Sequence, residues 1–165
     1  MARDSNGGAV LLLAALVFGG LYLSRDSLQN REAPEFSLPE AYGGHLDLAS
    51  YRGRPVLLVF WTTSCGICRH ELPLLSRIAP EMRSKGIAVM AINIGGGSDA
   101  RDYMRSNHIR MTSLMDETGQ VARAYRVNGV PKLVLIGADG KIVRSEAGMA
   151  DESVLREWTD AVGGS

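Results

Sequence analysis

The chain of 165 residues has no excess of either charge, because 18 Lys and Arg residues balance 18 Asp and Glu residues. A balanced chain offers no broad basic surface to a phosphate backbone, so we expect no nucleic-acid partner. It also has only two cysteines and three histidines. A structural zinc site needs about four ligands, so we expect no resident metal and no cofactor. No internal repeat or low-complexity segment is visible, which leaves room for one modest domain.

The N-terminal segment lacks charged and strongly polar side chains between Gly7 and Leu23. This run is just long enough to cross a bilayer as a helix. No Ala-x-Ala-like pair marks a cleavage site near its end. We therefore expect residues 1–24 to be a retained membrane anchor, with a cleaved signal peptide as the alternative. The polar residues 25–35 are then a tether, and residues 36–165 form the domain.

Both cysteines lie in the tetrapeptide Cys65-Gly66-Ile67-Cys68, between an apolar run and the start of an expected helix. The run 56–61 predicts a buried strand. Hydroxyl residues at 62–64 are good helix caps, and helix formers continue to about residue 84. The N–H groups of a helix N-terminus favour a thiolate, and the i, i+3 spacing allows a disulfide. The pair therefore indicates reversible thiol–disulfide exchange. The alternative is two ordinary buried thiols that have no redox function.

The rest of the domain alternates apolar runs with helical segments. Strands are expected over 87–94, 109–115, 132–136 and 141–145, and helices over 98–107, 120–125 and 151–162. Turn glycines between the last two strands predict a hairpin. Helices between apolar strands, followed by a hairpin and a terminal helix, indicate a mixed α/β sandwich with a parallel core.

Four segments together resemble a known family. The segment 60–73 is similar to the active-site segment of thioredoxin-like proteins, and 33–39 with 48–55 resembles the entry to the membrane-anchored TlpA/ResA-like group. The segment 125–131 resembles the part of that family that carries a cis-proline. The resemblance implies a thioredoxin-like three-layer sandwich. It further implies a mixed sheet with a central βα insertion, near residues 98–115, and an N-terminal transmembrane anchor.

The resemblance also assigns roles to residues around the cysteines. Cys65 would be the exposed nucleophile and Cys68 the buried resolving thiol. Pro131 would form a cis peptide, and the Val130 backbone would pair with an extended substrate. The remaining substrate-binding positions are Trp61, Ser64, Gly66 and Ile67. Ser64 stands where the family usually has a second tryptophan, so the apolar platform beside the nucleophile is missing.

Two positions that hold a buried proton-shuttling acid in relatives have none here. Val59 occupies the strand position of one, and Gly95-Gly96-Gly97 replaces the other. Such an acid would take the proton of the resolving thiol. Glu71 is close in sequence and is a candidate for this role, with a structural or solvent-facing position on the helix as the alternative.

The function implied is that of an extracytoplasmic thiol:disulfide oxidoreductase that reduces exported proteins, for example during cytochrome c maturation. Its partners would be protein disulfides and a membrane electron donor. It would be a single-pass protein of the cell membrane with its catalytic domain on the periplasmic side. One alternative is a peroxiredoxin-like peroxidase, since Thr62 lies three residues before Cys65, although Leu58 replaces the proline of that motif. The other is a non-enzymatic module that binds or delivers metal through the thiols.

Overall fold

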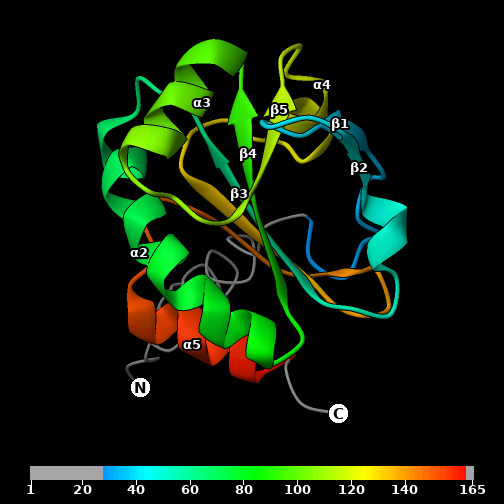
Figure 1. Ribbon diagram of the computed structural model, residues 1–165. Coiled ribbons are helices and arrows are strands. Elements are labelled where there is room, and N and C mark those ends of the chain that lie inside the picture. The colour runs from blue at the N-terminus through cyan, green and yellow to red at the C-terminus, as the bar shows by residue number, and fades with distance from the viewer. Residues whose placement is uncertain (1–27, 163–165) are drawn as a thin grey trace, which may run out of the picture.

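The structure of the protein is a computed structural model that describes residues 28–162. Its centre is a five-stranded sheet in the order β5-β4-β3-β6-β7 (Figure 1). Strands β3, β4 and β5 are mutually parallel, β6 pairs antiparallel with β3, and β7 pairs antiparallel with β6. The strands are β3 (Val56–Trp61), β4 (Ala88–Ile94), β5 (Thr112–Asp116), β6 (Lys132–Ile136) and β7 (Ile142–Ala147). The predicted mixed sheet with a parallel core is confirmed.

Helices and a small hairpin cover the two faces of this sheet and give three layers. One face carries α2 (Gly66–Ser84), α3 (Gly97–Ser106) and α5 (Glu152–Asp160). The other face carries α4 (Gln120–Ala124), the 3-10 helix η1 (Leu48–Tyr51) and the hairpin of β1 (Ser37–Pro39) and β2 (His45–Asp47). Figure 1 shows α5 beside the C-terminal half of α2. Arg156 pairs there with Glu81, and Lys85 Nζ lies 2.7 Å from Asp160 Oδ1.

Strand β3 lies at the middle of the sheet and is buried along its whole length. Alternate side chains of a strand point to opposite faces. Leu57 and Trp61 therefore pack in the core beneath α2, whereas Leu58 and Phe60 pack in the core under the hairpin and α4. This double burial explains the continuous apolar run, which is typical of strands covered on both faces. The buried strand therefore fixes the position at which the chain enters the segment that carries the two cysteines.

Most expected elements are present, with small shifts at their ends. The expected strand at 109–115 is β5, which starts at Thr112 and forms the sheet edge. With α3 it forms the predicted βα insertion between β4 and α4. The sequence patterns did not predict β1, β2 and η1, whose segments are too short to show a period. Helix α2 begins at Gly66, one residue later than expected.

The expected anchor, residues 1–24, lies outside the described residues, as does the start of the tether. Among residues 28–162, no helix combines the length and apolar character that a membrane crossing requires.

Candidate active site

Cys65 caps the N-terminus of α2 with its own sulfur. Its backbone is extended (φ −80°, ψ 106°), and its Sγ accepts a hydrogen bond from the N–H of Cys68 at 3.1 Å. The prediction that a hydroxyl group at residues 62–64 caps this helix is therefore wrong. Thr62 Oγ1 and Ser64 Oγ lie 3.3 Å from each other instead. A sulfur reaches the first-turn N–H groups because the helix starts directly after it. Any negative charge on this sulfur is stabilised by the helix N-terminus.

Cys65 and Cys68 form a disulfide, with their Cα atoms 5.3 Å apart. The alternative of two ordinary buried thiols is therefore wrong. The two sulfurs differ in access, because Cys65 is half-buried and Cys68 is 0% exposed. An incoming disulfide or thiol can reach only the Cys65 side. This difference in burial matches the expected division into an attacking and a resolving cysteine.

The Val130–Pro131 peptide is cis, as the resemblance implied. It brings the Val130 carbonyl oxygen to 3.6 Å from Cys65 Sγ. Pro131 is buried, and its own carbonyl accepts from the N–H of Gly148 at 2.8 Å. The segment that follows β7 is thereby held against the cis-proline.

The other predicted substrate positions differ in exposure. Ser64, Gly66 and Ile67 lie exposed around Cys65, and the Ile67 side chain is 55% exposed. Trp61 is 0% exposed, so it lies beneath this surface. Met149, which follows the Gly148 turn, is the other large apolar side chain exposed near the cis-proline, at 56%. Ile67, beside the disulfide, and Met149, which follows the contact with the cis-proline, are thus exposed apolar side chains.

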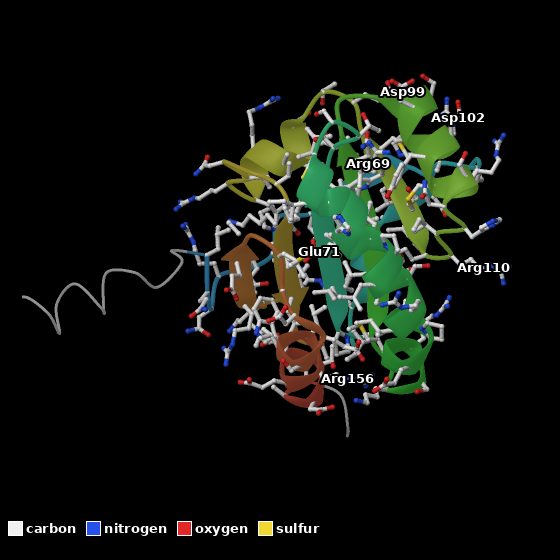
Figure 2. The ribbon with its side chains drawn as sticks, turned by 90° about the vertical axis from the view of Figure 1, so that its left-hand side faces the viewer. Arg69, Glu71, Asp99, Asp102, Arg110 and Arg156 are labelled. Carbon is white, nitrogen blue, oxygen red and sulfur yellow. A yellow bond between two sulfur atoms is a disulfide. The ribbon has the colours of Figure 1, made fainter. Side chains whose placement is uncertain are left out.

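Glu71 is a buried acid whose position the sequence left open. It is 1% exposed, so the solvent-facing alternative is wrong. Its Oε1 accepts from the N–H of Ala150 at 3.0 Å, and its Oε2 has no hydrogen-bond partner among residues 28–162. Figure 2 shows it on α2, on the side away from Arg69. The i, i+3 spacing from Cys68 was the available signal, because it places both residues on one helix face.

Burial raises the pKa of Glu71 to about 7, and the hydrogen bond from Ala150 only partly opposes this. Taking a carboxylate out of water disfavours its charged form. A carboxyl with this pKa exchanges protons readily near neutral pH, as a general acid or base must. Glu71 is therefore suited to the proton-shuttling role that Val59 and the glycines at 95–97 do not fill.

The sequence and the fold of this chain are similar to those of known proteins. The model of the AhpC/TSA family matches residues 30–145. The chain belongs to the AhpC/TSA family. It is 27% identical over 161 residues to the thiol-disulfide oxidoreductase ResA of Bacillus subtilis, covering 94% of this chain and 90% of that one. It is 29% identical over 126 residues to ResA of Geobacillus kaustophilus, covering 75% and 72% of the two chains.

Solved structures agree with this family. A Chlorobium tepidum structure, described as a thiol:disulfide interchange protein DsbE, superposes with a TM-score of 0.77 at 30% identity. The match covers 86% of this chain and all of that one, 100%. A thioredoxin from Neisseria meningitidis superposes with a TM-score of 0.72 at 29% identity, covering 79% and 88%. The thioredoxin-like fold and the TlpA/ResA-like resemblance are confirmed, and the protein is a thiol–disulfide oxidoreductase.

The geometry of the site gives little support to the two alternatives, a peroxidase and a metal-binding module. Leu58, which replaces the motif proline of a peroxidase, is fully buried in the sheet. Over residues 28–162, no three His, Cys, Asp or Glu side chains are grouped as metal ligands.

The raised pKa of Glu71 predicts an unusual dependence of stability on pH. A carboxyl whose pKa is higher in the folded protein binds its proton more tightly there. The stability that this contributes is complete below the unfolded pKa and is lost as pH rises towards about 7. The free energy of unfolding of the oxidised protein should fall across this window, with a slope of at most about 1.4 kcal/mol per pH unit.

Denaturant unfolding at several pH values measures this slope. Glu71→Gln should flatten it, because the amide does not titrate. Glu146→Gln, at an exposed position of β7, should leave the wild-type slope unchanged. A wild-type slope that Glu71→Gln does not reduce would contradict the assignment.

Proposed function

We propose that the protein reduces disulfides of exported proteins through a Cys65–Cys68 dithiol cycle. The observation that carries this proposal is the pairing of an accessible N-cap sulfur with a fully buried one, beside the Val130 carbonyl. ResA and DsbE are the relatives whose names describe this chemistry.

The cycle begins with Cys65 as a thiolate, stabilised by the N–H of Cys68. It attacks one sulfur of a substrate disulfide, and the other substrate sulfur leaves as a thiolate that takes up a proton. Cys68 then attacks Cys65 Sγ in the mixed disulfide and expels the second substrate sulfur. The substrate gains two electrons, and the Cys65–Cys68 disulfide forms.

Glu71 is proposed to accept the proton of Cys68 in the second step. Cys68 is 0% exposed, so water is poorly placed to take this proton. Within the part of the chain that the structure describes, the Oε2 atom of Glu71 has no hydrogen-bond partner, and Glu71 belongs to the same buried helix face as Cys68. A carboxyl with a pKa of about 7 can take the proton and release it again near neutral pH.

A reducing direction is favoured by the residues between the cysteines. Gly66 and Ile67 include no histidine, and a histidine there is the feature of strongly oxidising relatives of this fold. The oxidised pair must then be reduced again, and a membrane electron donor is the proposed source. Cytochrome c maturation is an example of a process that needs such a reductant.

The proposed location is the cell membrane, with the catalytic domain on the periplasmic side. The apolar run from Gly7 to Leu23 is the proposed single-pass anchor. A disulfide cycle on exported proteins requires a compartment in which disulfides persist. The proposed substrate-binding set is Ser64, Gly66, Ile67, Val130 and Pro131, whereas the expected contact with Trp61 is corrected, because that side chain is fully buried and supports this surface from beneath.

The exchange mechanism predicts opposite behaviour of two single variants. Cys68→Ser retains the nucleophile but cannot resolve, so it should accumulate a mixed disulfide with a protein such as insulin, and should lose turnover by at least about 100-fold. Cys65→Ser should neither turn over nor form the adduct, because its remaining sulfur is buried. Non-reducing electrophoresis and mass spectrometry measure the adduct.

An adduct formed equally by Cys65→Ser would contradict the assigned roles. Rapid peroxide consumption by the reduced wild type, without reduction of insulin, would replace this function by a peroxidase. Metal retained by the anaerobically purified protein, with no adduct in either variant, would favour metal delivery.

The anchor predicts where the full chain is found in a Gram-negative host. It should stay in the membrane pellet after a high-salt wash, and protease should digest its domain once the outer membrane is opened. A chain that begins at residue 28 should be released from the pellet. Recovery of the full chain in the soluble fraction, or its protection by the inner membrane, would contradict this location.

A further inference from the structure

Helix α2 contains a proline close to its catalytic end, and this proline leaves one carbonyl without its usual partner. In an α-helix the carbonyl of residue i accepts from the N–H of residue i+4. The carbonyl of Arg69 would therefore accept from residue 73, which is Pro73 and has no N–H. Arg69 directly follows Cys68, so the missing bond lies in the first turns of the helix, beside the disulfide.

Tyr103 of the inserted helix α3 supplies the missing donor. Its hydroxyl donates to the Arg69 carbonyl at 3.0 Å. Figure 2 shows Arg69 on the part of α2 that faces α3. A hydroxyl from a separate element thus replaces a bond that the helix cannot make for itself.

The ring of Tyr103 makes two further contacts at the same place. The Arg69 guanidinium carbon lies 5.5 Å from the ring centroid, within the range of a cation–π contact. The ring also packs against Trp61, with the two centroids 5.5 Å apart. Trp61 ends β3 and Arg69 belongs to the start of α2. Tyr103 therefore contacts both elements that flank the disulfide.

These contacts bear directly on the atoms that stabilise the nucleophile. The N–H of Arg69 donates to the Cys65 carbonyl at 3.2 Å, and the preceding N–H, that of Cys68, donates to Cys65 Sγ at 3.1 Å. Fixing Arg69 at its carbonyl fixes the orientation of this first turn. The N–H of Cys68 then stays aligned with the sulfur, where it favours the thiolate.

We propose that Tyr103 is a positioning residue of the redox site, whose hydroxyl replaces the N–H that Pro73 lacks and so stabilises the Cys65 thiolate. This role of Tyr103 matters for catalysis only through the proposed function, on which the inference rests. The insertion of α3 between β4 and α4 is thereby part of the active site, although Tyr103 does not touch the disulfide in the contacts described above. Because the thiolate belongs to the reduced form, stabilising it shifts the thiol–disulfide equilibrium towards the dithiol.

Tyr103→Phe tests the hydroxyl alone, since it keeps the ring. We expect the pKa of Cys65 in the reduced protein to rise, and the equilibrium with glutathione to shift about two- to fivefold towards the disulfide. Thiolate absorbance against pH measures the first quantity, and alkylation of protein equilibrated in glutathione buffers measures the second. Unchanged values in Tyr103→Phe would overturn the proposal, even if the variant unfolds more easily.

Tyr125→Phe is the matched control. It also removes a hydroxyl that bonds a backbone carbonyl, that of Pro34 at 2.8 Å, but on the opposite face of the sheet. It should lower stability without changing the thiolate pKa or the glutathione equilibrium. A shift in Tyr125→Phe as large as in Tyr103→Phe would reduce the effect to general destabilisation and overturn the proposal.

Pro73→Ala provides a rescue, because the alanine N–H can bond the Arg69 carbonyl from within the helix. In this background Tyr103→Phe should change the equilibrium by less than about 1.5-fold, so the double-mutant cycle should show strong coupling. Equal effects of Tyr103→Phe in the wild-type and the Pro73→Ala backgrounds would overturn the replacement argument. Insulin reduction is assayed separately: an intact equilibrium shift in an enzyme that does not reduce insulin would contradict the proposed function and support this inference.

Discussion

The hydrogen bond from the Cys68 N–H to the Cys65 sulfur is the interaction on which the site depends. It makes a cysteine the N-cap of α2, where serine, threonine, asparagine or aspartate is usual. A thiolate at that position meets unpaired N–H groups and the positive end of the helix, so charge on the nucleophile is favoured. The same helix start separates the two sulfurs by burial and thereby decides which of them meets the substrate.

Three other parts of the fold hold this cap in place. Strand β3 is buried on both faces and fixes the point where the chain enters the corner. The cis peptide before Pro131 places the Val130 carbonyl beside Cys65. Helix α3 contributes Tyr103, which bonds the carbonyl that Pro73 leaves free. Glu71 adds a buried carboxyl joined to the segment after β7 through Ala150. A site of two cysteines thus draws on residues spread over most of the domain.

Sequence patterns predicted the parts of this arrangement that depend on local signals. Apolar runs identified β3, β4 and β6, and the cysteine spacing with a helix start indicated the disulfide. The cis-proline followed only from the resemblance, because an isolated Gly-Val-Pro segment favours a trans peptide. The burial of Glu71 was left open because it is decided by the packing of α2 against the segment at Ala150, 79 residues away in sequence. The sequence predicted a hydroxyl group as the N-cap of α2, because sulfur is a weaker hydrogen-bond acceptor than oxygen.

The reduction potential of the Cys65–Cys68 pair tests the central claim most directly. The domain is equilibrated in buffers of known thiol–disulfide ratio, quenched with acid and alkylated, and the two forms are counted by mass. For a reducing protein, the potential should be more negative than about −200 mV, in the range of thioredoxin and the glutaredoxins. A less negative value would place the pair with disulfide isomerases and DsbA, at about −180 to −120 mV, and would contradict a reducing function.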